Sequence, residues 1–385
     1  MSSAADSPIG SEPPAGSEGV ATPVTGGKTG LKSFPCRQCG ARLEYAPGTD
    51  SLTCPYCRAV NAIGQSDVIV KELEYGAALR QIGSMAPKSE GLSVKCDACA
   101  AEIAVPQNAT SFACPFCGSN IVATAKMTSH ILPNAVLPFK VAKEQALGMF
   151  RQWVASRWFA PGALKSRSLL DARFVGMYMP AWTYDAQTTT DYQGQRGDAY
   201  YETEWVTVNG QRQSRRVRKI RWSPASGRVE DSFDDLLVLA SRTLPEEQAG
   251  QLEPWDLKAL VPYADEYLAG FKAECYTIGL EEGFETARAM MQPRIESTVR
   301  DDIGGDEQRI DDLRTQVYGV TYKHILLPVW MNAYRFNGKV YRFLVNARTG
   351  EVIGDRPYSA TKITLFVLMC VVIAGVILAI VAASR

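Results

Sequence analysis

The sequence predicts two small four-cysteine β domains in tandem, then an α+β region with antiparallel sheets, and last one C-terminal transmembrane helix. Three observations support this fold class. Eight of the 10 cysteines form C-x-x-C pairs, helix-like and strand-like patterns alternate over residues 130–358, and residues 363–383 carry no charge. A chain of 385 residues is long enough for several domains and a substantial core.

The overall charge does not direct the chain toward one class of partner. It has 41 basic and 41 acidic residues, so nothing global attracts it to nucleic acid or to anionic lipid. Its first residues contain no apolar run of the kind found in a secretory signal. We therefore expect a reducing compartment, in which the thiols bind metal rather than form disulfides.

The N-terminal third divides by composition and by repetition. Residues 1–32 are rich in Ser, Ala, Gly, Pro and Thr, and we expect disorder because they cannot bury enough apolar surface to offset their ordering entropy. The first cysteine domain is expected at 33–62 and its repeat at 94–124. The linker, 63–93, contains Glu72–Ile82, whose apolar spacing predicts a short amphipathic helix.

Each cysteine domain has the spacing C-x2-C-x14-C-x2-C, which is typical of a zinc ribbon. Four thiolates in two close pairs can enclose a tetrahedral Zn²⁺, and each pair is supplied by a tight knuckle. Four protein ligands leave no open coordination position, so we expect two structural zinc ions. Iron in a rubredoxin-like site is the main alternative. The predicted metal ligands are Cys36, Cys39, Cys54, Cys57, Cys96, Cys99, Cys114 and Cys117.

Local features of the repeats support the ribbon interpretation. Gly40 and Gly118 each follow a knuckle, where the backbone often needs a positive φ. The spacer of the first unit predicts two short strands, Arg42–Tyr45 and Ser51–Thr53, joined by a turn. Each ribbon is too small to fold on a hydrophobic core of its own, so we expect metal binding to supply its folding energy.

Residues 130–358 are interpreted as an α+β region of two related modules, 130–250 and 251–358. In each of them a helix precedes strands that read as an antiparallel meander. The predicted strands are Tyr178–Thr190, Tyr201–Val208, Gln211–Trp222, Leu327–Phe336 and Lys339–Asn346.

Helices and hairpins in this region have local signals. Lys143–Ser156 and Glu281–Val299 show helical spacing of apolar residues, although Pro293 is expected to break or kink the second helix. Asn209-Gly210 and Asn337-Gly338 lie between strand-like runs. Both pairs predict hairpins, because a type I′ turn needs a positive φ at its two central positions.

A basic run lies on one of the predicted hairpin strands. Its members are Arg212, Arg215, Arg216, Arg218, Lys219 and Arg221. Successive strand residues point to opposite faces, so the run divides between two faces. Glu202 and Glu204, on the preceding strand, can pair with some of these cations. Two interpretations stay open: a solvated, ion-paired hairpin, or a surface for phosphate or an acidic partner.

Residues 363–383 predict a transmembrane helix. A bilayer core needs ~20 helical residues, and a helix satisfies its own backbone groups, so this uncharged run can cross lipid alone. Basic residues are more frequent before the run than after it, and the positive-inside rule then places residues 1–362 in the cytosol. We expect a single-pass protein of the inner (plasma) membrane; a buried core helix is the alternative.

Several stretches outside the ribbons are also distinctive. They read RWFAPG (157–162), MPAWTYDAQTTTDYQGQRGD (179–198), EPWDLKALVPY (253–263), DDIGGDEQRI (301–310) and KHILLPVWMNAYRFNGKVYRFLVNARTGEV (323–352). With the duplicated ribbons, they make the chain resemble a family of bacterial tail-anchored zinc-ribbon proteins, often labelled primosomal protein N′ or superfamily II helicase-like. The resemblance implies zinc ligation by the cysteines. It does not extend to helicase activity, because the sequence has no nucleotide-binding loop and no Walker B strand.

These features predict a membrane-anchored zinc-binding adaptor that presents two structural ribbons to a cytosolic protein partner. Two ribbons in tandem offer bivalent binding. The alternative is a membrane-associated nucleic-acid-binding protein of the replication or primosome type, without helicase activity. Zero net charge and the lack of aromatic–basic interleaving on the ribbons disfavour it. We find no catalytic motif and do not expect an enzyme, and a catalytic pocket in the α+β region is a third hypothesis.

Overall fold

The computed structural model describes residues 34–64, 70–84, 91–96, 101–104, 111–114, 120–122, 126–128, 131–159, 161, 174–208, 211–244, 246–336, 339–355 and 358–383. Residues 1–32, which we expect to be disordered, lie outside these ranges, as do Cys99, Cys117 and Gly118 of the second ribbon.

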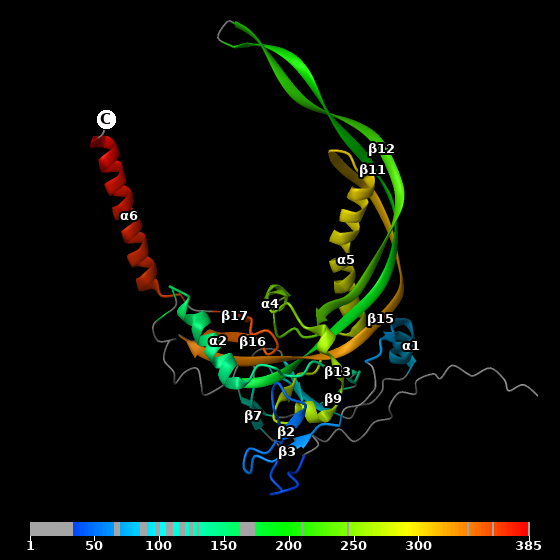
Figure 1. Cartoon of the computed structure of the whole chain (residues 1–385), viewed down its shortest axis with the longest axis vertical. Helices are drawn as coiled ribbons and strands as arrows, with labels where there is room; N and C mark the ends of the chain where they lie inside the picture. Colours follow the sequence, from blue (N-terminus) through cyan, green and yellow to red (C-terminus); the bar gives the residue numbers. More distant parts are fainter. Residues whose placement is uncertain are drawn as a thin grey trace, which may run out of the picture.

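A nine-stranded, mainly antiparallel sheet forms the body of the molecule (Figure 1). Its strands are β4 (Leu73–Glu74), β10 (Ala135–Val136), β11 (Val175–Val208), β12 (Gln211–Leu239), β13 (Val261–Pro262), β14 (Lys272–Ala273), β15 (Glu307–Phe336), β16 (Lys339–Asn346) and β17 (Val352–Gly354). The central path runs β12–β11–β15–β10–β13, with β14 beside β11, and with β4 and β16 beside β15. The sheet therefore joins strands from both halves of the α+β region.

The three long strands exceed the predicted ones. Tyr178–Thr190 and Tyr201–Val208 are parts of the single strand β11, Gln211–Trp222 is the first part of β12, and Leu327–Phe336 is the last part of β15. β16 has its predicted bounds. The additional segments are polar and contain Gly or Pro, so their local composition resembles a loop. They are strands because β11 hydrogen-bonds to β12 along one edge and to β15 along the other.

Both predicted hairpins are confirmed by the pairing of their strands. Val208 pairs with Gln211, and Phe336 pairs with Lys339, so each connection has the two-residue length that an Asn-Gly turn requires. The Asn-Gly residues themselves lie outside the described residues. The first hairpin extends far from the body and curves as it twists (Figure 1).

Helix α5 (Leu280–Ile303) packs against β11, β12 and β15 (Figure 1). It continues through Pro293, so the expectation that this residue breaks the helix is wrong. The buried face repeats at helical spacing and includes Phe284, Ala287, Met291, Ile295, Val299 and Ile303. Packing of this face against the sheet outweighs the cost of about 3 kcal/mol for an internal proline.

Two helical glycines are expected to respond oppositely to alanine. A Cβ atom on Gly283 of α5 would lie 2.6 Å from Tyr184 Oη and 2.8 Å from Trp182 Cδ1. Gly148, in α2 (Lys143–Ala155), has open space at the same position. Alanine is favoured over glycine in a helix by about 1 kcal/mol, so Gly148→Ala should raise the free energy of unfolding by roughly that amount.

Gly283→Ala should instead lower the free energy of unfolding by about 1–3 kcal/mol, because overpacking outweighs the gain in helix propensity. Chemical denaturation of the full chain in detergent micelles, followed by circular dichroism, measures both variants. Stabilisation by both substitutions would show that Trp182 and Tyr184 move aside without cost.

Helices predicted before and after the second ribbon are confirmed with small changes of their bounds. α2 ends one residue before the predicted Ser156. α1 (Tyr75–Ser84) begins later than the predicted Glu72, because Leu73 and Glu74 pair with β15 as β4. The Glu74 carboxylate then accepts a hydrogen bond of 2.8 Å from the Ala77 N–H, which caps the start of the helix.

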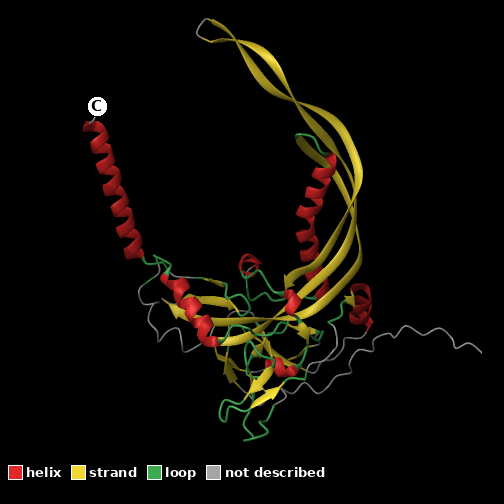
Figure 2. Ribbon diagram, viewed as in Figure 1, coloured by secondary structure: helices red, strands yellow, loops and turns green. Residues whose placement is uncertain are grey.

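Three small sheets, formed by the cysteine domains, lie at the end of the body opposite the long hairpin (Figure 2). The first contains β1 (Glu44–Tyr45), β2 (Ser51–Thr53) and β3 (Val60–Ala62), and the others contain β5 (Gly91–Lys95), β6 (Glu102–Ala104), β7 (Ser111–Ala113), β8 (Asn120–Val122) and β9 (Lys126–Thr128). The predicted strand Arg42–Tyr45 is thus shorter, with Arg42 in an isolated bridge to Pro35.

The C-terminal helix, α6 (Ala360–Ala383), is long and apolar enough to span a membrane. None of its most apolar window is buried inside the protein, and the helix projects away from the body (Figure 1). This exposure argues against the alternative of a buried core helix. Its described contacts with the body lie near its start, where Phe366 packs edge-on against Phe159.

Candidate metal centre

The first cysteine domain brings its four predicted ligands together. The Sγ atoms of Cys36, Cys39, Cys54 and Cys57 all lie within 4.8 Å of one another. Two of the separations, from Cys36 to Cys57 and from Cys39 to Cys54, are 3.5 Å. A tetrahedral ion with metal–sulfur bonds of about 2.3 Å places sulfurs ~3.8 Å apart, whereas a disulfide needs about 2.05 Å. The cluster could therefore hold a zinc ion.

Two equivalent knuckles hold these sulfurs in place. The Cys36 N–H donates to Ala41 O at 2.7 Å, and the Cys54 N–H donates to Ala59 O at 2.9 Å. After the first knuckle, Gly40 has φ 74°, as predicted for this position. The second knuckle places Arg58 at φ 62°, a conformation that only a few per cent of non-glycine residues adopt. The hydrogen-bonded knuckle holds Arg58 in this conformation, although a residue with a Cβ atom adopts it at an energetic cost.

The backbone favours thiolates at the two buried cysteines. The N–H of Cys39 contributes most to lowering the pKa of Cys36, and the N–H of Cys57 contributes most to lowering the pKa of Cys54 to about 6. At Cys57 the Ala59 N–H lowers the pKa, but burial and the neighbouring thiols raise it to about 12. All four groups can be thiolates only when a cation offsets their charge, which fits a metal such as Zn²⁺.

The first ribbon shares a hydrophobic core with the body. Tyr45 is buried, packs edge-on against Tyr267 with ring centroids 5.3 Å apart, and donates its N–H to Ala269 O at 2.9 Å. The Gly48 N–H donates to Phe139 O at 2.8 Å. Leu43, Leu52 and Ile63 belong to the same core cluster as Phe139. Burial against the body therefore adds to the folding energy that we expect from metal binding.

The second ribbon has two of its predicted ligands in the described part of the chain. Cys96 and Cys114 are both buried and belong to one core cluster with Met177, Leu252 and Val329. The Cys96 N–H donates to Ala101 O at 2.8 Å, as the Cys36 N–H does to Ala41 O in the first ribbon. Cys99 and Cys117 lie outside the described residues, so a four-sulfur cluster is seen only in the first ribbon.

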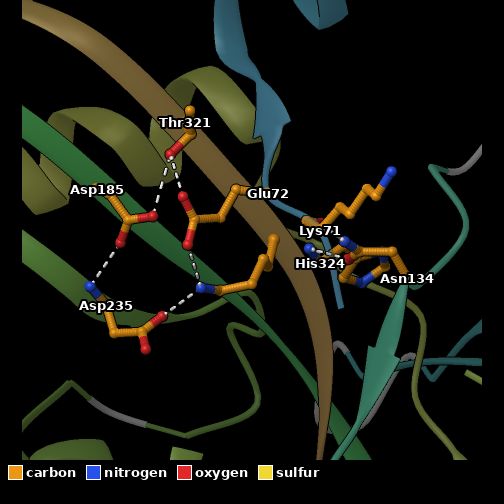
Figure 3. A network of polar contacts seen from close by, with 8 residues as sticks. Lys71, Glu72, Asn134, Asp185, Asp235, Thr321 and His324 are labelled. Carbon is orange, nitrogen blue, oxygen red and sulfur yellow. Dashed lines mark hydrogen bonds and ion pairs between the residues drawn. The ribbon is translucent and has the colours of Figure 1, made fainter. Parts of the chain in front are cut away.

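A polar network around Asp185 has no counterpart among the sequence predictions (Figure 3). Asp185 lies at a bulge of β11 and accepts the Asp235 N–H at 2.6 Å. The Thr321 hydroxyl lies 3.0 Å from Asp185 and 3.1 Å from Glu72. The Lys323 ammonium contacts Asp235 at 2.7 Å and Glu72 at 3.1 Å, and so supplies the positive charge that these carboxylates need.

This network ties the linker between the ribbons to the sheet. Beside it, Asn134 donates to Lys71 O at 3.0 Å and accepts the His324 N–H at 2.8 Å (Figure 3). No spacing in the sequence signals these contacts, because Glu72 and Thr321 are 249 positions apart. Glu72, Asp185 and Asp234 also approach closely enough to hold a cation, but Glu72 is already paired with the Lys323 ammonium.

Asp185→Asn is expected to change the pH dependence of stability. Burial raises the pKa of Asp185 to about 6, while the Asp235 N–H and Lys323 oppose the shift. With a raised pKa, the folded state keeps the Asp185 proton at pH values where the unfolded state has already lost it. The free energy of unfolding therefore falls as pH rises from about 4 to 6. The Asn variant should therefore gain about 1–2 kcal/mol relative to wild type between pH 4.5 and 7, after allowance for partial solvent exposure.

Denaturation of both proteins at pH 4.5 and 7 measures this difference. Thr315→Val, at a site where two threonines of neighbouring strands share a hydrogen bond, serves as a control without a titrating group. A constant difference between wild type and Asp185→Asn at the two pH values would contradict the raised pKa.

In the part of the chain that the structure describes, the fold and the cysteine cluster define a mixed α+β protein with a large antiparallel sheet, one four-cysteine cluster near its N-terminus and one exposed apolar C-terminal helix. The chain is similar to Uncharacterized protein YdjG of Bacillus subtilis (strain 168), with 25% identity over 334 residues, which cover 86% of this chain and 92% of that protein. No family model and no solved structure matches the chain. The comparisons give no support to the primosomal N′ label.

Proposed function

We propose that this protein is a membrane-anchored zinc-binding adaptor, which presents its ribbons to a protein partner in the cytosol. The observation that carries this proposal is the separation of two features on one body. The four-cysteine cluster is docked at one end, and the apolar helix α6 projects from the other side (Figure 1). A partner bound at the ribbons would then be held at a fixed distance from the bilayer.

The residues at the base of α6 support its insertion into a membrane. Trp158 and Tyr358 are 73% and 61% exposed, and Lys362 donates to Trp158 O at 3.2 Å. Trp, Tyr and Lys are the residues that concentrate where a transmembrane helix leaves the hydrocarbon. A bilayer around α6 would cover an apolar surface that the described protein leaves in water.

The exposed surface of the first ribbon supports a role in protein binding. Tyr56, inside the second knuckle, is 80% exposed, and Val60 on β3 is 68% exposed. Arg58 lies between them in sequence and is also exposed. Aromatic and arginine side chains are enriched at the centres of protein interfaces, and here the closed knuckle fixes the backbone that carries Tyr56 and Arg58.

Cross-linked pull-down from native membranes tests the proposal. The intact protein should capture a defined set of cytosolic proteins, and Tyr56→Ala/Val60→Ser should lose them while keeping its zinc content. Met290→Ser, which changes an exposed apolar residue of α5, is the matched control and should capture the same proteins as the intact chain. A Cys96→Ser/Cys99→Ser variant measures the contribution of the second ribbon. Capture that is indifferent to both ribbon variants would reject the adaptor role.

A further inference from the structure

The outer part of the β11–β12 hairpin has no third strand. β15 begins opposite Gly197, so from Asp198 to the turn β11 is paired with β12 alone. This free ribbon is roughly 35 Å long, and two-stranded ribbons are only marginally stable in water without a partner surface. The hairpin and α6 project from the same side of the body (Figure 1). A membrane that α6 enters would therefore face the side of the body from which the hairpin extends.

The strand register divides the ribbon into two chemically different faces. Directly opposed residues share a face, and Thr203 is opposite Arg216 while Glu204 is opposite Arg215. We call the first the arginine face; it contains Tyr201, Thr203, Trp205, Thr207, Arg212, Ser214, Arg216 and Arg218, and no carboxylate. The second, the paired face, contains Tyr200, Glu202, Glu204, Val206, Gln213, Arg215, Val217 and Lys219.

The paired face contains ion pairs between its two strands. Lys219 contacts Glu202 at 2.6 Å and Glu204 at 2.8 Å. These ion pairs confirm one of the two interpretations of the basic run for this face. Because both carboxylates lie on the paired face, the excess positive charge of the ribbon lies on the arginine face.

The arginine face combines cations with exposed aromatic rings. Arg212 lies over the ring of Trp205, 5.9 Å from its centroid, and Arg216 lies 5.1 Å from the centroid of Tyr201. Trp205 is 64% exposed and Tyr201 is 60% exposed. Arg218, nearer the body, is paired with Glu307 at 2.8 Å. Among the described residues, Arg212 and Arg216 have no carboxylate within ion-pair distance.

We propose that the arginine face binds the headgroups of anionic phospholipids in the membrane that α6 enters. Guanidinium groups donate planar pairs of hydrogen bonds to phosphate, and Trp and Tyr rings partition to the interface between headgroups and acyl chains. An anionic leaflet supplies the negative charge that Arg212 and Arg216 do not find in the described protein. Contact at the hairpin and at α6 holds the body against the bilayer at two points.

Quenching of Trp205 by brominated lipid tests this contact in the full chain. The protein is reconstituted into vesicles of phosphatidylcholine, with or without phosphatidylglycerol, whose acyl chains carry bromine. The quenched emission of wild type minus that of Trp205→Phe isolates Trp205, and α6 contributes no signal because it contains no tryptophan. This difference should be at least about twofold larger with phosphatidylglycerol, and it should decrease as salt screens the charges.

Two matched double variants assign the contact to one face. Arg212→Gln/Arg216→Gln should remove the phosphatidylglycerol-dependent quenching, whereas Arg215→Gln/Arg221→Gln, with the same change of net charge, should keep it. Equal behaviour of the two variants would overturn the proposal. Binding of a labelled oligonucleotide to the protein in phosphatidylcholine vesicles would also overturn the proposal, if Arg212→Gln/Arg216→Gln reduced that binding by a larger factor than it reduced the quenching.

The inference rests on insertion of α6, which is the membrane part of the proposed function, and not on the adaptor role. Flotation of the same vesicles separates the two failures. Vesicles that float without the protein reject both the anchor and the lipid contact. Vesicles that carry the protein but do not quench Trp205 reject the lipid contact alone.

Discussion

Cys54→Ser is expected to abolish metal binding at the first cysteine cluster. Zn²⁺ contributes about 10 kcal/mol or more to a structural four-ligand site, and it requires all four thiolates for a closed tetrahedron. Cys54 is fully buried, so serine would also leave a hydroxyl without its metal partner inside the protein. Elemental analysis of the purified full chain should show the loss of about one zinc ion per chain relative to wild type.

The docking of the ribbon on the body limits how far the structure opens after this loss. Tyr45 and its neighbours still have their apolar contacts with Tyr267 and Phe139, so the sheet should stay folded while the knuckles open. Hydrogen exchange should increase at residues 34–42 and 54–60 and stay low in β15 and in residues 175–197 of β11, which pair with it. Cys275→Ser, outside the cluster, is the control for thiol loss and should keep all metal. Unchanged metal content in Cys54→Ser would refute the assigned site.

Removal of α6 is expected to release the protein from membranes without unfolding it. A chain ending at Tyr358 loses a helix whose one charged residue is Lys362 and whose apolar part the body does not bury. Its described losses in the body are small: the edge-on contact of Phe366 with Phe159, the hydrogen bond from Lys362 to Trp158 O, and the hydrogen bond of 2.8 Å from the Ser359 N–H to Phe159 O. Fractionation after alkaline carbonate extraction should move the protein from the membrane pellet to the supernatant, with its zinc content and denaturation midpoint nearly unchanged.

A milder variant tests the same helix within the full chain. Val372→Arg/Ile373→Asp places two charges near the middle of α6, at a cost of about 3 kcal/mol for each in a bilayer. This variant should therefore move to the supernatant. Leu378→Ala, which leaves the helix apolar, should remain in the pellet. If the truncated chain unfolds, α6 would instead be a core helix whose partner surface lies on another molecule.

Features with a local physical cause were predictable from the sequence. Metal-ligand spacing identified the cluster of Cys36, Cys39, Cys54 and Cys57, because four thiolates in two knuckles need few other residues to meet. Hydropathy alone identified the apolar helix at 363–383, and the Asn-Gly pairs identified two hairpins whose strands do pair. Each of these signals acts over a short stretch of chain.

Features that depend on distant contacts were decided only by the tertiary structure. Polar segments of β11, β12 and β15 became strands through pairing with one another, and α5 continued through Pro293 because one of its faces is buried on that sheet. The docking of Tyr45 on Tyr267, and the meeting of Glu72 with Lys323, join residues about 200 or more positions apart. A local pattern contains no information about such partners, since register and packing are selected by the whole fold.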